Sequence, residues 1–385
     1  MTFVPANTAL PQPAADALAH SARLQILIRD EIVHAGGWIG FARYMELALY
    51  APGLGYYSAG SHKLGVAGDF ITAPELSPLF GRTLARQISP LISAGMNDII
   101  ELGAGSGALA ATLLAELDAL DRLPRQYRIL EVSADLRQRQ QARIASAAPR
   151  IAERVQWLDR LPERIEAVVV ANEVLDALPV HRIRIVDGHA QELGVTIDGG
   201  GRFAWASRPA SPALVAAVPE LPEGYETEIG LAAQALVTDL GRRLERGLLL
   251  MFDYGFPAHE FFHPQRDRGT LMCHYRHHAH DDPFLWPGLQ DITAHVDFSA
   301  VARAAPQLEL SGYTSQAQFL INGGITELLA EVPASDVARY APLAAEAQKL
   351  LSPAEMGELF KVIALGRNLH VPLQGFRSGD RSHTL

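Results

Sequence analysis

Alternate glycines follow a carboxylate in the segment Ile99–Gly107, which reads Ile-Ile-Glu-Leu-Gly-Ala-Gly-Ser-Gly. The apolar residues and Glu101 predict the end of a buried strand, and the glycines predict a tight turn after it. Glycine adopts positive φ and has no Cβ, so such a turn lets a ligand come close to the backbone. Gly103, Gly105 and Ala108 also fit the looser dinucleotide pattern G-x-G-x-x-[GA]. The segment therefore predicts a nucleotide-like ligand and leaves open which one it is.

Acidic or polar side chains stand where four of the predicted strands end. Glu101 lies beside the glycines, Glu131 ends the next strand, Asp159 follows the third, and Asn172 and Glu173 end the fourth. In an open parallel sheet, ligands bind outside the carboxyl ends of the strands. A carboxylate at the position of Glu131 can accept hydrogen bonds from both hydroxyls of a ribose. Enzymes that use dinucleotides and enzymes that use S-adenosylmethionine share this feature, so it does not separate the two ligands.

The charge of Glu101 separates these ligands better. A carboxylate just before the glycines would repel a pyrophosphate, but it suits a ligand that carries an ammonium and a sulfonium. The glycines would then make room for a methionyl chain. The alternative is that Glu101 caps or braces the loop, and an NAD-linked oxidoreductase stays open as a remote alternative.

The predicted elements after the glycine turn alternate between strand and helix. Apolar runs predict strands, and apolar residues at helical spacing predict helices. This order indicates an α/β protein with a parallel sheet and helices on both faces. Alternating polar and apolar residues over 181–206 predict an inserted β-hairpin. Further strands are expected at 127–132, 155–158, 167–172, 246–253, 308–313 and 360–365, and helices at 108–120 and 135–147.

The segment before the glycine turn is expected to hold helices and one long loop. Residues 1–20 are rich in alanine and proline and predict a loose tail. The pattern over 22–49 is helical and is broken in two by the glycine pair 36–37. A loop over 50–74, rich in glycine and aromatic residues, is too long and apolar for a simple connection, so we expect it to fold over something. A further helix over 78–89 is expected to stop at the proline that follows.

Charge and composition exclude some classes of function. The chain has 385 residues and a net charge of −10, which argues against a general nucleic-acid binder because such proteins neutralise phosphates with lysine and arginine. The apolar runs are shorter than the roughly 20 residues that span a bilayer. Cys273 is the sole cysteine, so no disulfide can form within the chain. The first 22 residues hold no lysine or arginine and resemble neither a secretory signal nor a transit peptide. We therefore expect a cytoplasmic protein.

Four segments together resemble the MidA family, and the resemblance runs from Ile39 to Arg367. They are Gly68–Glu75, Glu101–Gly107, Asn172–Val180 and Gln290–Phe298. The resemblance implies a class I methyltransferase that uses S-adenosylmethionine to methylate a protein. Mitochondrial members assist assembly of respiratory complex I and are credited with symmetric dimethylation of an arginine in one of its subunits. We therefore expect a protein substrate with an arginine, no nucleic acid, no membrane insertion and no metal, with a homodimer left open.

The resemblance also implies an architecture. We expect a Rossmann-like sheet of seven strands with helices on both faces, an N-terminal helical cap, and inserted hairpin and helical segments. The corresponding boundaries are a flexible tail over 1–20, the cap over 21–92, and a methyltransferase domain over 93–385 with insertions near 181–240 and 314–358.

Cofactor binding is expected from the glycine turn, the strand ends and the loop before them. Asp69 would meet the amino group of the cofactor while Phe70 shields it from water. The alternative is a tight turn in which the aspartate bonds to its own backbone. The full set is Gly68, Asp69, Phe70, Thr72, Glu101, Gly103, Ala104, Gly105, Gly107, Glu131, Asp159 and Asn172.

The candidate catalytic residues are Glu173, Asp176, Asp253 and His295. A guanidinium is a poor nucleophile because it is always charged and delocalised, so an arginine methyltransferase needs carboxylates that concentrate electron density on one nitrogen. Glu173 and Asp176 are three residues apart, and one helical turn could aim both at the same point. The alternative is that one of them caps the next helix. Asp253 ends the fifth strand and His295 lies in the segment 290–298; each is a candidate for substrate contact, against a structural role.

The histidine-rich segment 273–282 invites a metal interpretation. Histidines at this spacing, with Asp291 and His295 nearby, could ligate zinc. The segment has neither C-x-x-C nor H-E-x-x-H spacing, so we expect its side chains to line the substrate side or brace loops. A different class of function stays open, namely an assembly chaperone that binds S-adenosylmethionine, or nothing, and no longer catalyses.

Overall fold

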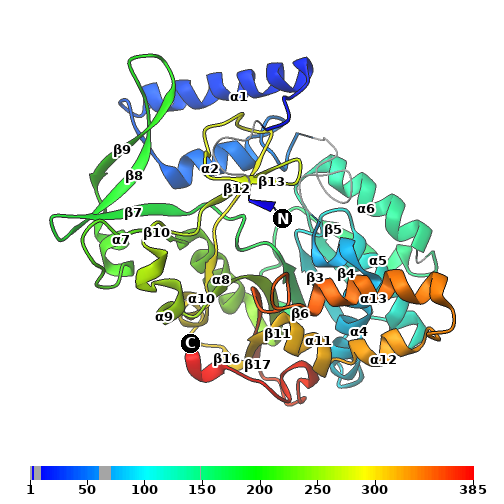
Figure 1. The fold of residues 1–385 in the computed structure, drawn as a ribbon. Coiled ribbons are helices and arrows are strands. Elements are labelled where there is room, and N and C mark those ends of the chain that lie inside the picture. The colour runs from blue at the N-terminus through cyan, green and yellow to red at the C-terminus, as the bar shows by residue number, and fades with distance from the viewer. Residues whose placement is uncertain (1, 4–9, 60–70, 148) are drawn as a thin grey trace. The chain divides into compact units, whose positions relative to one another are not determined.

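The computed structural model describes residues 2–3, 10–59, 71–147 and 149–385 of the chain (Figure 1). These residues pack in two compact units, each built from three stretches of sequence. Unit 1 holds Met1–Phe70, Asp176–Leu236 and Phe256–Asp297, and unit 2 holds Ile71–Leu175, Val237–Gly255 and Phe298–Leu385. Residues 71–92, which were expected in the N-terminal cap, therefore pack in unit 2.

Unit 2 is built on a mixed β-sheet. Its strands are β3 (Asp98–Leu102), β4 (Gln126–Leu130), β5 (Val155–Leu158), β6 (Ile165–Asn172), β11 (Leu244–Phe256), β16 (Glu309–Ser315) and β17 (Phe360–Arg367). They follow the order β16-β17-β11-β6-β3-β4-β5 across the sheet. The pairs from β11 to β5 are parallel, whereas β17 is antiparallel to both β11 and β16.

The α/β class is confirmed. The strands that alternate with helices after the glycine turn are parallel, as the sequence indicates. The two further strands expected near 308–313 and 360–365 join the same sheet as β16 and β17, and β17 is antiparallel to both of its neighbours. An apolar run indicates that a strand is buried but not its direction, so the sequence left the direction of β17 open.

Both faces of the central strands are buried, as expected where helices cover a sheet. In β6, Val168 and Val170 pack into one core with α4 (Pro78–Ser93) and α5 (Ala108–Ala119). Val169 points to the opposite face and is also buried. The sheet is thus packed on both faces. This packing fixes the strand ends that carry the predicted site residues.

Helices α4 and α5 approach each other closely because Gly81 has no side chain. A Cβ on Gly81 would lie 2.0 Å from Oγ1 and 2.9 Å from Cβ of Thr112. This contact bears on the site because α5 begins directly after the glycine turn. Helix α4 continues through Pro90 to Ser93, although the proline was expected to end it. A proline in the last turn removes only one helical hydrogen bond, so the helix tolerates it.

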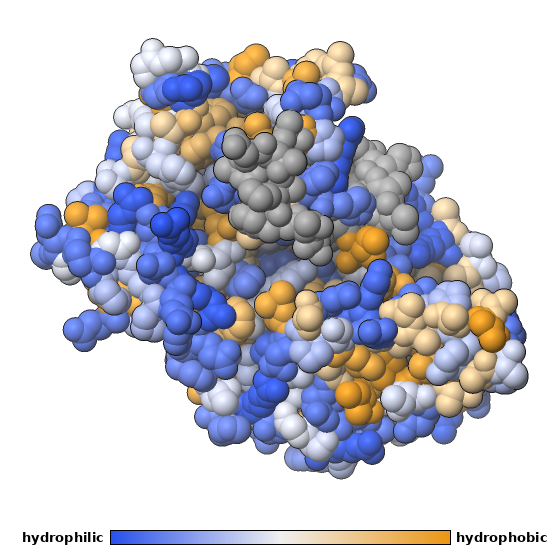
Figure 2. All heavy atoms as spheres, viewed as in Figure 1, coloured by the Kyte–Doolittle hydropathy of each residue, from blue (hydrophilic) through white to orange (hydrophobic). Residues whose placement is uncertain are grey.

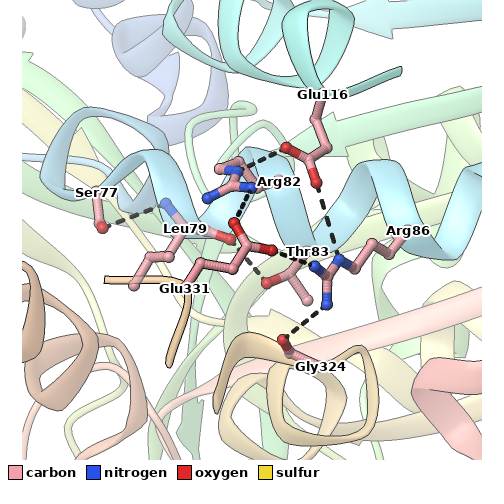
Figure 3. A network of polar contacts seen from close by, with 8 residues as sticks. All are labelled: Ser77, Leu79, Arg82, Thr83, Arg86, Glu116, Gly324 and Glu331. Carbon is pink, nitrogen blue, oxygen red and sulfur yellow. Dashed lines mark hydrogen bonds and ion pairs between the residues drawn. The ribbon is translucent and has the colours of Figure 1, made fainter. Parts of the chain in front are cut away.

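An ion-pair network connects α4 with α5 and with Glu331 (Figure 3). Glu116 of α5 is buried and accepts a hydrogen bond from Nε of Arg82 at 2.6 Å, while Arg86 lies 3.8 Å from its other oxygen. Both arginines also donate to Glu331, at 2.7 and 2.8 Å, just after α12 (Ile325–Ala330). The arginines supply the positive charge that a buried carboxylate needs, and the network joins α4, α5 and α12.

Unit 2 also holds five further α-helices and three short 3-10 helices among its described residues. They are α3 (Ala73–Leu76), α6 (Ala134–Ala147), α10 (Phe298–Ala304), α11 (Gln316–Asn322), α13 (Val337–Leu351), η1 (Ala152–Arg154), η3 (Gln374–Phe376) and η4 (Ser382–Thr384).

Unit 1 combines helices with mostly antiparallel strands. The helix expected over 22–49 is broken at the glycine pair, as predicted, and its first half begins at Ala15, within the segment expected to be a tail. The inserted hairpin is confirmed as β8 and β9, and β7 adds a third antiparallel strand to it. The elements are β1 (Thr2–Phe3), α1 (Ala15–His34), β2 (Ile39–Gly40), α2 (Phe41–Tyr50), β7 (His181–Val186), β8 (His189–Ile197), β9 (Phe203–Pro209), α7 (Pro212–Ala217), β10 (Glu226–Ile229), α9 (Ala258–Phe261), β12 (Met272–Tyr275), β13 (His278–His280), β14 (Asp291–Thr293) and β15 (Val296–Asp297), and α8 (Leu231–Arg243) runs from unit 1 into unit 2.

Exposed apolar side chains on α1 interrupt a mainly hydrophilic surface. Figure 2 shows orange spheres over this helix, and the exposed large apolar residues there are Leu18, Ile26 and Val33. Single apolar side chains on a hydrophilic surface are common. Among the described helices, none has the length and apolar character that crossing a bilayer requires.

We expect Gly81→Ala to destabilise the protein by roughly 1–3 kcal/mol, because the added methyl group would overlap with Thr112 across the α4–α5 contact. Urea unfolding followed by circular dichroism measures the change. Gly199→Ala is the matched control, since a Cβ at that position meets nothing within 4 Å. Adding Thr112→Ala should restore part of the loss. Equal stability of the Gly81 and Gly199 variants would contradict the prediction.

Candidate functional site

The three glycines of the turn after β3 adopt the left-handed conformation, as the sequence predicts. Their φ angles are +61° at Gly103, +52° at Gly105 and +84° at Gly107. A Cβ on Gly107 would lie 3.1 Å from Cα of Gln140. Ala104 is buried, and its carbonyl accepts the N–H of Gly107 at 2.8 Å. Residues with side chains adopt this conformation only at a cost, so the turn needs glycine for its backbone shape and, at Gly107, for space.

Glu101 is buried at the end of β3, directly before this turn, with 3% of its surface exposed. Tyr127 of β4 donates its hydroxyl to Oε2 of Glu101 at 2.7 Å. Burial raises the pKa of Glu101 to about 7; the bond from Tyr127 lowers it, and the charge of Glu131 raises it. A carboxylate in this state gains most from a cationic ligand, because a nearby positive charge stabilises the ionised form.

Glu131 directly follows β4, and neighbouring donors anchor its carboxylate. Oε1 accepts the N–H of Ser133 at 2.9 Å, and Oε2 accepts an N–H of Gln140 at 3.1 Å. An ionised carboxylate has about four acceptor sites, so it can receive a diol beside such bonds. Burial raises the pKa of Glu131, and these two bonds lower it. Asp159 after β5 differs: its side chain is 88% exposed and pairs with Arg137 at 2.6 Å.

Asn172 and Glu173 lie at the end of β6, where Glu173 has a φ of +53°. Such a backbone is strained for a residue with a side chain, and its surroundings must hold it. Oε1 of Glu173 accepts the N–H of Ala73 at 3.2 Å and Nδ2–H of Asn172 at 3.0 Å. Oδ1 of Asn172 is buried and has no hydrogen-bond partner among the described residues. The helical turn that could have aimed Glu173 and Asp176 at one point does not form, because residues 173–176 form bends and a turn.

The carboxylate of Asp253, expected to contact substrate, accepts backbone N–H groups. It is 1% exposed. Its Oδ2 accepts the N–H groups of Val174 at 3.2 Å and Leu175 at 2.8 Å, and its Oδ1 accepts that of Tyr254 at 2.9 Å. Residues 174 and 175 directly follow Glu173, so Asp253 fixes the turn that carries this glutamate. These bonds favour a positioning role for Asp253 over contact with substrate.

Side chains outside the predicted set join the glycine turn to the segment before α4. The hydroxyl of Ser106 donates to Glu75, and Arg143 donates to both, with 2.7 Å between Nη1 and Oε1 of Glu75. Glu75 lies in α3, whose first turn forms on the carbonyl of Thr72, which accepts the N–H of Glu75 at 3.0 Å. Glu75 belongs to the segment 68–75 that resembles the family, so the sequence drew attention to it. No feature of the sequence pointed to Arg143.

Asp176 and His295 belong to unit 1, whereas Glu173 belongs to unit 2. The structure brings the first two segments together, because the carbonyl of Asp176 accepts the N–H of Ala294 at 3.1 Å. The N–H of His295 donates to Oγ1 of Thr270 at 3.0 Å. A joint action of these residues with Glu173 stays a prediction. The predicted residues Gly68, Asp69 and Phe70 lie outside the described residues.

The histidine-rich segment forms a β-hairpin in unit 1. Strands β12 and β13 pair antiparallel, and Arg276 and His277 make the turn with positive φ. Burial lowers the pKa of His274 to about 4, so this imidazole is neutral near pH 7. Within the described part of the chain, no three side chains form a group that could hold a metal ion. The hairpin gives the segment a structural explanation.

The groups around the glycine turn fit S-adenosylmethionine. Glu101 offers a buried carboxylate to its positive charge, and Glu131 offers acceptors to its ribose. The buried oxygen of Asn172 accepts no bond from the described residues and suits an ammonium donor. The glycine turn leaves its backbone open to close approach. This α/β fold and this set of groups define an S-adenosylmethionine-dependent methyltransferase.

Sequence comparison agrees with the site. A family profile described as "Putative S-adenosyl-L-methionine-dependent methyltransferase" matches residues 79–314. The chain belongs to this family of MidA-like methyltransferases, so the resemblance found in the sequence is confirmed, and its cofactor is S-adenosylmethionine.

Named relatives match most of the chain. The Danio rerio "Protein arginine methyltransferase NDUFAF7, mitochondrial" is 30% identical over 366 residues, which are 86% of this chain and 84% of that protein. The Homo sapiens protein of the same name is 28% identical and covers 90% of this chain and 83% of its own length.

A solved structure shares both the fold and the cofactor class. A protein from Burkholderia thailandensis bound to S-adenosyl-homocysteine is 52% identical, with a TM-score of 0.95 over 98% of this chain and 100% of that chain.

We expect the affinity for S-adenosylmethionine to rise about tenfold between about pH 6 and about pH 8, because Glu101, whose pKa is about 7, ionises in this window and its ionised form attracts the cationic ligand. Tyr127→Phe removes a bond that lowers this pKa, so the rise should move to higher pH. Calorimetric titration across the pH range measures both effects. An affinity that does not change with pH would show that Glu101 does not face the cofactor.

Proposed function

We propose that the protein transfers a methyl group from S-adenosylmethionine to an ω-nitrogen of an arginine in a protein substrate. The observation that carries the proposal is the placement of Glu173 on the turn after β6, next to the glycine turn, where a Cβ on Gly103 would meet Cγ2 of Val174 at 3.2 Å. The names of the relatives, protein arginine methyltransferase, support arginine as the acceptor.

The chemistry needs a carboxylate because the acceptor is a cation. When bound, the cofactor would supply a methyl group on a sulfonium: the carbon–sulfur bond would break as a nitrogen–carbon bond forms, S-adenosylhomocysteine would leave as a neutral thioether, and the proton lost by the nitrogen would pass to solvent. Glu173 would hold the guanidinium and draw its charge away from the reacting nitrogen. Its side chain is fixed by Ala73 and Asn172, so it would orient the acceptor without first reorganising. Asp176 is proposed as the second carboxylate, and His295 as a contact on the substrate side.

A cytoplasmic location and a role in assembly of respiratory complex I belong to the same proposal. Complex I comes from the family resemblance, whereas the relatives carry the word mitochondrial in their names. Cys273 is free and buried, which suits a reducing compartment.

Transfer of labelled methyl tests the proposal directly. The purified protein is incubated with tritiated S-adenosylmethionine and an extract of the source cells, and the labelled proteins are hydrolysed to amino acids. The proposal expects the label in ω-N-methylated arginine. Label in methyl-lysine would overturn the choice of arginine. Binding of S-adenosylhomocysteine without any transfer would favour a binding protein that no longer catalyses.

We expect Glu173→Gln to lower the transfer rate by at least about 100-fold, because the neutral amide cannot draw charge from the guanidinium. Affinity for S-adenosylhomocysteine, measured by calorimetry, should change by less than about threefold. Glu166→Gln is the matched control, since Glu166 is an exposed carboxylate on the same strand β6. Equal rates for the two variants would remove Glu173 from the substrate side.

A further inference from the structure

Helix α6 carries a polar stripe that contacts the loops of the cofactor site. The stripe consists of Arg137, Gln140 and Arg143, spaced three residues apart and so on one side of the helix. Arg137 donates to the carbonyl of Glu131 at 2.6 Å and to the carbonyl of Leu158 at 3.0 Å. Arg143 binds Glu75 and Ser106. One helix face therefore touches the glycine turn, both neighbouring strand ends and α3.

Gln140 occupies the centre of this stripe and is fully buried. Its Nε2 donates to the carbonyl of Gly105 at 2.9 Å and to Oε2 of Glu131 at 3.1 Å. Its Oε1 accepts the indole N–H of Trp157 on β5 at 2.7 Å. The carboxamide thus uses both of its N–H groups and its oxygen.

The indole of Trp157 fixes which way the carboxamide of Gln140 faces. An indole nitrogen donates and never accepts, so the oxygen of Gln140 must face Trp157. The amide N–H groups then face Gly105 and Glu131, which both present acceptors. If the carboxamide were flipped, its oxygen would face the oxygens of Gly105 and Glu131, and its NH₂ group would face the indole N–H of Trp157. Both contacts are unfavourable, so the observed orientation is strongly preferred.

We propose that Gln140, oriented by Trp157, is a positioning residue for the cofactor: it sets Glu131 toward the ribose and holds the Gly105 carbonyl back from the methionyl chain. The inference rests on the proposed role of Glu131. The bond from Gln140 also lowers the pKa of Glu131 against the effect of burial, which favours the ionised form that accepts two hydroxyls. Neither Gln140 nor Trp157 needs to touch the cofactor for this role.

Two substitutions separate positioning from mere support of the fold. Gln140→Glu keeps the shape of the side chain but replaces its NH₂ group by a carboxylate oxygen. This oxygen then faces the carbonyl of Gly105 and the carboxylate of Glu131. Trp157→Phe removes the N–H that orients the amide, together with part of the ring that packs against the core. Gln138→Glu is the matched control, because it makes the same change at an exposed position of α6.

Calorimetry with S-adenosylhomocysteine and with its 2′-deoxy analogue gives the readout, with circular dichroism to confirm folding. We expect Gln140→Glu to weaken S-adenosylhomocysteine at least about tenfold and Trp157→Phe about threefold, whereas the control stays unchanged. The affinity for the 2′-deoxy analogue, which lacks one ribose hydroxyl, should fall less in both variants than the affinity for S-adenosylhomocysteine.

Unchanged affinity in folded variants, or equal losses for the two ligands, would overturn the inference. If Gln140→Glu does not fold, Trp157→Phe alone tests the inference, through its loss of affinity for S-adenosylhomocysteine compared with its loss for the 2′-deoxy analogue. Because the measurement needs no methyl acceptor, a wild-type protein that binds S-adenosylhomocysteine but transfers nothing would end the proposed function and leave this inference standing.

Discussion

The left-handed glycine turn after β3 is the constraint on which the rest of the site depends. Gly103, Gly105 and Gly107 all have positive φ, so the chain reverses within a few residues from a buried strand into α5. At its three glycines the main chain carries no side chain, and a ligand can come close there. The packing of α4 on α5 at Gly81 fixes the helix that follows. Local backbone shape and the position of a whole helix are thus linked.

The carboxylates near this turn differ in role because their partners differ. Glu101 is buried against one hydroxyl and titrates near neutral pH. Glu131 is buried but accepts two N–H bonds that favour its ionised form. Asp253 accepts backbone N–H groups from Val174, Leu175 and Tyr254, and these bonds shape the loop after β6. Asp159 is exposed and paired with an arginine. Four similar residues at strand ends have four different electrostatic states.

The sequence predicted features that depend on local pattern and failed where distant residues decide. The glycine turn, the α/β class and the strand β5 follow from apolar runs and from glycine spacing, and the structure agrees with them. The sequence left the direction of β17 open, because an apolar run indicates burial in either direction. The hydrogen bonds of Asp253 could not be foreseen, since they reach Val174 and Leu175, about eighty positions earlier in the chain. Residues 68–70 lie outside the described part.

The contacts of α6 with the cofactor site could not be foreseen from the sequence. The physical reason also explains why these contacts matter. Within the described residues of this helix, only Gln140 and Ile144 are buried, so apolar packing contributes little to its position. Polar contacts must hold it, and these contacts end on the carbonyls and carboxylates that form the cofactor site. In a sequence, polar residues at this spacing resemble an ordinary solvated helix face. A helix held through the site cannot shift without moving the site, so the docking of α6 and the geometry of cofactor binding depend on the same few hydrogen bonds.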